Sequence, residues 1–271
     1  MYNLLKGKVG IISGALDENS IAWKIAETAH AEGAKFVLTN APVALRMGTI
    51  QQLADKCNTI VIPADATSIA DWENLYEKAT EHLGGKLDFA LHSIGMSPNV
   101  RKKRDYGNLN HAWTLQAIDI SGLSFHKMLQ VAEKMDIFNE EASVVALSYI
   151  AAQRTFPDYS DMAHAKAVLE SIARSYGYRL GTSKKIRVNT VSQSPTPTTA
   201  GTGVDGFDAF FNYAEKMSPL GNASAQDCAD FVISLFSDFT KKVTMQNLYH
   251  DGGFSAMGVS EDIMNMFGEG K

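Results

Sequence analysis

The sequence predicts an α/β protein with a doubly wound parallel sheet, and three observations carry this prediction. Short apolar runs rich in β-branched residues recur along the chain, which is typical of strands buried on both faces. Longer stretches of helical period separate these runs, and strands that alternate with helices form parallel sheets. The chain has neither an internal repeat nor a linker rich in proline or serine. We therefore expect residues 1–271 to form a single Rossmann-like domain.

The expected sheet has seven strands, at 9–12, 35–38, 59–62, 87–91, 143–147, 186–189 and 243–249. Ser20 is a suitable N-cap for the first helix, and two longer helices are expected near 111–135 and 157–180. The stretch after the sixth strand is irregular and then rich in aromatic residues. We expect residues 194–217 to form a substrate-binding lid, although a surface loop whose aromatics complete the core is the alternative.

The composition excludes several classes of protein. Hydrophobic residues make up 45% of the chain and charged residues 20%, which rules out intrinsic disorder. The 25 basic and 30 acidic residues give a net charge of −5, which argues against nucleic acid or an anionic membrane as the main partner. No apolar run approaches the roughly 18 residues of a membrane span, and the first residues make a poor signal peptide. Cys57 and Cys228 show no metal-ligand spacing, so we expect reduced cysteines in a cytoplasmic protein.

The loop after the first strand is a candidate dinucleotide site. A turn at Gly14 leads into the helix after Ser20, and free backbone N–H groups near Ile21 suit a pyrophosphate. Gly14 is the only glycine of this loop, so the usual G-x-G-x-x-G fingerprint is missing. The loop alone is therefore a weak signal for a dinucleotide.

The ends of the second and third strands concern the adenosine half of such a cofactor. At Asn40 the sequence has no acidic reader for a ribose 2′-hydroxyl and no basic reader for a 2′-phosphate, which favours NADH over NADPH only modestly. Arg46, one helical turn further, is either a 2′-phosphate ligand or a solvated helix residue. Asp65, beside Ala66, either accepts the adenine amino group or caps the next helix.

The fourth strand leads into Ser93, Ile94 and Gly95, small or apolar residues whose backbone would approach the ribose and nicotinamide. His92, which precedes them, is expected to be packed in the core rather than catalytic. Met96 follows them and is a candidate substrate contact.

Two tyrosines and a lysine after the fifth strand are the candidate catalytic residues. Tyr149 ends the strand, Tyr159 follows ten residues later, and Lys166 seven residues after that. On one helix, residues seven apart share a face, so the lysine could hold a ribose and polarise the hydroxyl of Tyr159. A core tyrosine and a surface lysine are the alternative, which spacing alone does not exclude.

These residues resemble the Tyr-x6-Lys signature of the enoyl-acyl-carrier-protein reductases, a divergent branch of the short-chain dehydrogenase/reductase superfamily. Three further motifs of that branch occur in the same order. They are a glycine at 14 followed by Ser-x-Ala at 20–22, His-Ser-Ile-Gly at 92–95, and Asp-Gly-Gly-Phe at 251–254. The resemblance covers essentially the whole chain.

The pattern of ordinary short-chain dehydrogenases is absent. Those enzymes use Tyr-x3-Lys, but Ala163 stands four residues after Tyr159. They also place a catalytic serine about 13 residues before the tyrosine, where this chain has Ala146. The difference favours reduction of an enoyl group over reduction of a carbonyl.

The resemblance implies roles for the candidate residues. Tyr159 would donate a hydrogen bond to the thioester enolate, and Lys166 would hold the nicotinamide ribose. Tyr149 and Phe207 would line the substrate site together with Met96. The start of the lid would touch the cofactor through Pro195, Thr196 and Thr198.

The expected activity is reduction of the trans-2 double bond of enoyl-acyl-carrier-protein thioesters by NADH, the last step of the fatty acid elongation cycle. A carbonyl-reducing short-chain dehydrogenase and a catalytically silent dinucleotide sensor are the alternatives. The resemblance also implies a homotetramer, which no periodicity in the sequence shows.

The chain departs from familiar bacterial members of this family in its basic residues. The stretch 204–208, where those members carry basic residues that meet the acidic carrier protein, has two aspartates and no base. A basic cluster of Arg101, Lys102, Lys103 and Arg104 follows the fourth strand instead. This cluster either docks the carrier protein or a coenzyme A phosphate, or is a solvated surface run.

Overall fold

Six parallel strands form one sheet in the computed structural model, which describes residues 2–46, 49–199, 201–202 and 206–268. The strands are β1 Val9–Ser13, β2 Lys35–Thr39, β3 Leu87–His92, β4 Phe138–Ser148, β5 Arg187–Gln193 and β6 Asn247–His250. Their order across the sheet is β2-β1-β3-β4-β5-β6. Because every pair is parallel, all six carboxyl ends lie at one edge of the sheet, and the order reverses between β1 and β3.

The segment 59–62, expected as a seventh strand, pairs with the sheet at a single bridge. Val61 pairs in parallel with Leu38, whose N–H donates to Ile60 O at 3.0 Å and whose carbonyl accepts from Ile62 N at 2.9 Å. Beyond Pro63, Ala64 N donates to Asn40 O at 3.1 Å, so the segment stays beside β2 past the bridge. The segment therefore runs beside β2 at the sheet edge but is too short to count as a strand.

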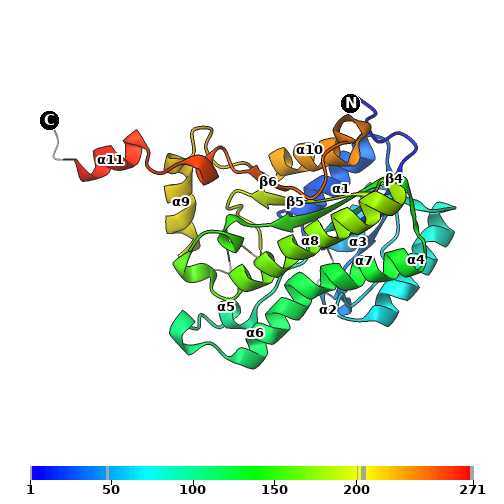
Figure 1. Ribbon diagram of the computed structural model, residues 1–271, viewed down its shortest axis with the longest axis horizontal. Coiled ribbons are helices and arrows are strands. Elements are labelled where there is room, and N and C mark those ends of the chain that lie inside the picture. The colour runs from blue at the N-terminus through cyan, green and yellow to red at the C-terminus, as the bar shows by residue number, and fades with distance from the viewer. Residues whose placement is uncertain (1, 47–48, 200, 203–205, 269–271) are drawn as a thin grey trace.

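Helices cover both faces of the sheet, which confirms the doubly wound prediction (Figure 1). One face carries α1 Ile21–Ala31, α3 Ile50–Lys56 and α10 Ala225–Phe236, and the other carries α4 Ile69–Leu83, α7 Ser124–Lys134 and α8 Met162–Lys184. Each layer closes over its own apolar core. Ile25 and Val232 are buried in the first core, and Phe125 and Leu169 in the second.

The remaining helices are α2 Pro42–Leu45, α5 Pro98–Arg101, α6 His111–Ile118, α9 Phe207–Met217 and α11 Glu261–Phe267. A π-turn at Asp119–Leu123 joins α6 to α7, so the long helix expected near 111–135 is confirmed. In Figure 1, α11 extends beyond α9 and away from the sheet. Across the described residues, no helix is both long enough and apolar enough to span a membrane.

The helix expected from residue 157 begins later, and Tyr159 lies outside it. Tyr159 ends a 3-10 turn at Pro157–Tyr159, and Ser160 adopts a left-handed conformation with φ of 51°. The expectation that Tyr159 and Lys166 share a face of one helix is therefore wrong. Buried hydrogen bonds set this geometry, because Asp161 at the N-cap of α8 accepts from Ser97 Oγ at 2.6 Å and from Asn99 Nδ2 at 2.7 Å.

Candidate active site

The loop after β1 lies where the strand order reverses. Gly14 has φ of 92°, and a Cβ at this position would lie 1.9 Å from Ser93 O in the loop after β3. The Gly14 N–H donates to Thr39 O at 3.0 Å, at the end of β2. Only glycine fits this close approach, which brings three strand ends together in the crevice where such folds bind ligands.

The N-terminus of α1 opens next to this loop. Ser20 occupies the N-cap as expected, but its hydroxyl donates to Asp17 O at 2.7 Å and accepts from Leu16 N at 3.2 Å. No side chain therefore caps the first N–H groups of the helix, which begin at Ile21. An anion placed there would meet unpaired donors and the positive end of the helix dipole.

Asn40 and Asp65 hold the backbone at the ends of their segments. Asn40 Nδ2 donates to Ala15 O at 2.8 Å, which ties β2 to the loop after β1. Asp65 accepts from the N–H and the hydroxyl of Thr67 at 2.9 and 2.8 Å. The N-cap of α4 is Ser68, so the alternative in which Asp65 caps that helix is wrong. Ala66 adjoins Asp65, and its carbonyl accepts from the Trp72 indole at 3.0 Å.

The loop after β3 separates a buried histidine from an exposed glycine. His92 Nε2 lies 2.8 Å from Ser124 Oγ, and burial, followed by the charge of Lys166, lowers the pKa of this imidazole to about 3. His92 is thus neutral and packed, as expected. Past Ser93 and Ile94, a Cβ on the exposed Gly95 would lie 3.8 Å from Lys166 Nζ.

Lys166 is buried, and its ammonium is held at the end of β4. Its Nζ donates to Leu147 O at 2.7 Å, although only 7% of the residue is exposed. Burial lowers the pKa of Lys166 to about 8, against the opposing attraction of Glu170. Lys166 is therefore mostly charged at neutral pH, and it loses its proton as the pH rises through about 8.

The rings of Tyr149 and Tyr159 lie next to each other, although the two residues are ten positions apart in the sequence. Their ring centroids are 4.7 Å apart at 45°. Burial raises the pKa of both phenols well above the usual value, so both keep their protons as hydrogen-bond donors. Neither hydroxyl bonds to another of the described residues, which leaves both for a ligand.

An aromatic cluster surrounds this pair, and it includes residues that the sequence did not single out. Phe156 lies 5.6 Å from Tyr149 and 4.9 Å from Phe210 of α9, measured between ring centroids. Phe254 lies 5.9 Å from Phe210. Phe207, the predicted substrate contact, packs on Phe211 with ring centroids 5.9 Å apart. The sequence pointed to Phe254 only through the motif at 251–254, from which no substrate contact was predicted.

The start of the expected lid meets the loop after β1. Thr199 Oγ1 donates to Asp17 Oδ2 at 2.5 Å, and the buried Thr196 follows Pro195 at the end of β5. Thr198 Oγ1 accepts from Gly201 N at 2.9 Å. Residues 200 and 203–205 of the expected lid lie outside the described residues.

Two further residues beside the site, Ser121 and Glu170, were not predicted. Met96 is held by Ser121, whose hydroxyl accepts from Met96 N at 2.8 Å and donates to Met96 O at 3.1 Å. Glu170 is 4% exposed and accepts from Ser148 Oγ at 2.6 Å and from Gln153 Nε2 at 2.8 Å. The available signal for Glu170 was its position one helical turn after Lys166.

The basic cluster after β3 divides in two. Arg101, Lys102 and Lys103 are exposed at the end of α5. Arg104 is half-buried, donates through Nε to Asn108 O at 2.9 Å and lies 5.8 Å from the Trp113 ring centroid. Arg104 therefore also has a structural role in its loop.

The fold is typical of a dinucleotide-binding reductase, and a tyrosine pair and a buried lysine lie at the end of β4. A sequence model described as "Enoyl-(Acyl carrier protein) reductase" matches residues 14–255. The chain belongs to this family.

Named relatives and solved structures agree with this assignment. Enoyl-[acyl-carrier-protein] reductase [NADH] 2 of Rhizobium meliloti is 31% identical over 94% of each chain. The reductase [NADH] FabI of Rickettsia bellii is 33% identical over 94% of this chain and 96% of its own. The crystal structure of the FabI–NADH complex from Alistipes finegoldii is 65% identical, with a TM-score of 0.97, over 100% of this chain and 95% of that one.

Proposed function

We propose that this protein reduces the trans-2 double bond of enoyl-acyl-carrier-protein thioesters by hydride transfer from NADH, in the last step of the fatty acid elongation cycle. Family membership supports the reaction class. The observation that carries the proposal is the pair of protonated tyrosines, Tyr149 and Tyr159, within an aromatic cluster. The buried ammonium of Lys166 lies at the end of β4, the strand that precedes Tyr149.

The residues at the carboxyl edge of the sheet fit a dinucleotide. Gly14 lets the loops after β1 and β3 approach closely, and Thr39 Oγ1 and Ser192 Oγ are buried there without a hydrogen-bond partner among the described residues. The pyrophosphate would lie against Gly14, Ser20 and Ile21. The remaining cofactor contacts would be Asn40, Asp65, Ala66, Ser93, Ile94, Gly95, Lys166, Pro195, Thr196 and Thr198. Bound NADH supplies the hydride.

The chain itself stabilises the negative charge that develops on the thioester oxygen. A protonated phenol with no other partner is a preorganised donor, and Tyr159 fills this role because burial keeps its pKa high. Lys166 orients the ribose through its ammonium. Tyr149, Met96 and Phe207 line the substrate, and the aromatic cluster keeps water from the enolate.

Carbonyl reduction finds no support in the residues around Tyr159. The fully buried Ala146 of β4 occupies the place of the serine that carbonyl reductases need, and it offers no hydroxyl. A silent sensor would have no use for two protonated tyrosines beside a buried lysine. We therefore keep enoyl reduction as the function.

Several finer features belong to this proposal. Residues 1–271 act as one catalytic domain, with 194–217 as the lid over the substrate. The carrier protein docks on the basic cluster of Arg101, Lys102, Lys103 and Arg104, since the first turn of α9 presents the exposed Asp208 instead of a base. The protein assembles as a homotetramer and works in the cytoplasm, where its free, buried cysteines stay reduced.

The test follows absorbance at 340 nm with a crotonyl thioester on carrier protein or coenzyme A, with NADH and NADPH in parallel. We expect rapid oxidation of NADH. Tyr159→Phe should lose turnover by about 100-fold and keep its affinity for NADH, because only the enolate loses a donor. Consumption of a ketoacyl substrate instead would contradict the proposed function, and full activity of Tyr159→Phe would contradict the role of its hydroxyl.

A further inference from the structure

A large cavity opens beside the tyrosine pair, outside the cofactor edge of the sheet. Its volume is about 840 Å³, and three segments form it. They are the loop after α5, the loop 151–157 after β4, and the first turn of α8. None of the predicted cofactor contacts lines this cavity.

The cavity adjoins the place where the thioester is expected to react. Phe156 lines it and also lies 5.6 Å from Tyr149, between ring centroids. Ser160 lines it and directly follows Tyr159. A group attached to the thioester could therefore extend from the tyrosine pair into this space.

The lining is strongly cationic. Among the described residues that line the cavity, Lys103, Arg104 and Arg154 are basic and Asp105 is acidic. Asp105 already accepts from Gly107 N at 2.8 Å, and Lys103 has an interaction partner of its own. Arg154 donates only to its neighbour's backbone, from Nη1 to Gln153 O at 3.1 Å, and forms no ion pair with any described residue.

Further donors remain at the same wall. Arg104 donates from Nε and Nη2 to Asn108. Its Nη1 has no hydrogen-bond partner among the described residues. Ser160 is 8% exposed, and its buried hydroxyl has no hydrogen-bond partner among the described residues. Guanidinium and hydroxyl groups in this arrangement favour a phosphate, whose oxygens accept several charge-assisted hydrogen bonds.

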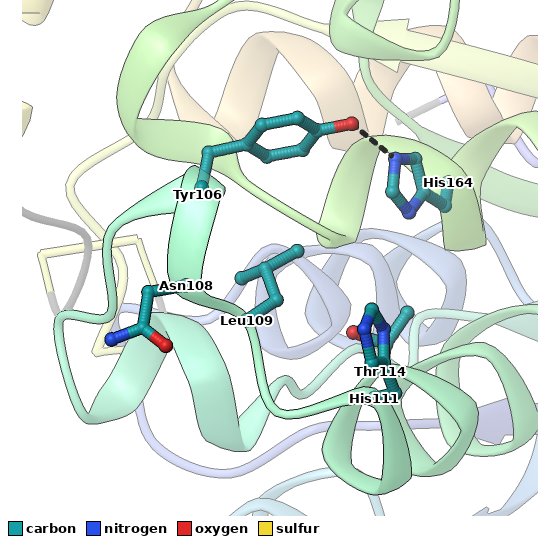
Figure 2. A pocket seen from close by; sticks show the side chains of 7 residues that line it. Tyr106, Asn108, Leu109, His111, Thr114 and His164 are labelled. Atoms are coloured by element: carbon teal, nitrogen blue, oxygen red, sulfur yellow. Dashed lines mark hydrogen bonds between the residues drawn. The ribbon is translucent and has the colours of Figure 1, made fainter.

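The neighbouring cavity differs in charge. Tyr106 and His164 line both cavities, and the Tyr106 hydroxyl lies 3.1 Å from His164 Nε2 (Figure 2). The second cavity, of about 410 Å³, has no lysine, arginine or carboxylate among the described residues that line it. The cationic character is therefore specific to the larger cavity that adjoins Tyr149 and Tyr159.

We propose that the larger cavity binds the phosphate of the phosphopantetheine arm that carries the enoyl thioester. This inference rests on the proposed function, and it adds a binding subsite made by Arg104, Arg154 and the hydroxyl of Ser160. Carrier protein and coenzyme A share this phosphate, so both kinds of substrate would use the subsite. This subsite would also provide the positive charge for the substrate that the first turn of α9 lacks.

The test compares three crotonyl thioesters, on carrier protein, on coenzyme A and on N-acetylcysteamine, which has no phosphate. Arg154→Gln should raise KM about tenfold for the first two and leave KM for the third unchanged. Its kcat and its Kd for NADH should also stay unchanged, which shows that the fold is intact. Arg174→Gln makes the same change at an exposed position of α8 outside the cavity, and it should alter none of these values.

The other outcomes contradict the subsite. An equal rise in KM for all three thioesters would mean that Arg154 only shapes the active site. A rise confined to the carrier protein thioester would mean that it touches the protein and not the phosphate. If the unmodified protein fails to oxidise NADH with any of the three thioesters, the proposed function is contradicted. Calorimetric titration then decides the subsite, which requires tighter binding of 4′-phosphopantetheine than of pantetheine and loss of that preference in Arg154→Gln.

Discussion

The hydroxyl of Ser148 donates a hydrogen bond of 2.6 Å to Glu170, one helical turn beyond Lys166 on α8. This bond fastens the residue before Tyr149 to the helix that carries the buried ammonium. Gln153 extends the connection, because its Nε2 donates to Glu170 at 2.8 Å and its Oε1 accepts from the Tyr249 hydroxyl at 2.7 Å. The strand end, the helix and β6 thus share one chain of hydrogen bonds beside the candidate catalytic residues.

The ammonium of Lys166 should make the affinity for NADH depend on pH. Burial lowers the pKa of this group to about 8, so the charge is present below that pH and is lost as the pH rises through it. We expect the affinity for NADH to fall between about pH 7 and pH 9, because a neutral amine binds the ribose less strongly. Fluorescence titration of NADH across this range measures the effect. Lys166→Met should bind weakly at every pH, and a wild-type affinity that stays constant to pH 9 would contradict the role.

The carboxylate of Glu170 should set the midpoint of that dependence. It raises the pKa of Lys166 against the effect of burial, so Glu170→Gln should move the midpoint of NADH binding to lower pH. Ser148→Ala is the matched control, because it removes the 2.6 Å hydrogen bond and keeps the carboxylate. We expect this control to leave the midpoint in place. Identical midpoints for Glu170→Gln and the unmodified protein would show that Glu170 does not influence the pKa of Lys166.

Much of the fold could be predicted from the sequence because its cause is local. Continuous apolar runs at β1, β3 and β4 can be buried on both faces only in a covered parallel sheet, and the structure has them there. The edge segment 59–62 also lies where the apolar pattern places it, in parallel beside β2, although it forms only one bridge there.

The site could be predicted only in part because its remaining causes are distant in sequence. The turn that takes Tyr159 out of the helix depends on Asp161, whose partners Ser97 and Asn99 lie more than sixty residues away. Likewise, Phe156 packs on Tyr149, and Phe254 packs on Phe156 from a separate loop. Spacing along one helix contains no information about such contacts.

The buried carboxylate of Asp161 should be a large contributor to stability. It accepts from Ser97, Asn99 and, at 3.0 Å, Thr114, and no lysine or arginine of the described chain pairs with it. Asp161→Ala leaves these buried donors unsatisfied, which costs about 3 kcal/mol of unfolding free energy. We expect Tm to fall by roughly 6 to 9 °C in a thermal scan. Asp208→Ala, at an exposed position, should change Tm little, and equal Tm values for the two variants would refute the assignment.

The close approach at Gly14 should make that position intolerant of any side chain. Gly14→Ala places a Cβ 1.9 Å from Ser93 O and forces alanine to a φ of 92°, and the backbone strain alone costs about 1 to 3 kcal/mol. The loops after β1 and β3 must then separate, so we expect a lower Tm together with loss of NADH binding in fluorescence titration. Gly85→Ala is the matched control, because a Cβ there meets no atom within 4 Å and should leave both values unchanged. If Gly14→Ala bound NADH with wild-type affinity, the crevice between β1 and β3 would not be the cofactor site.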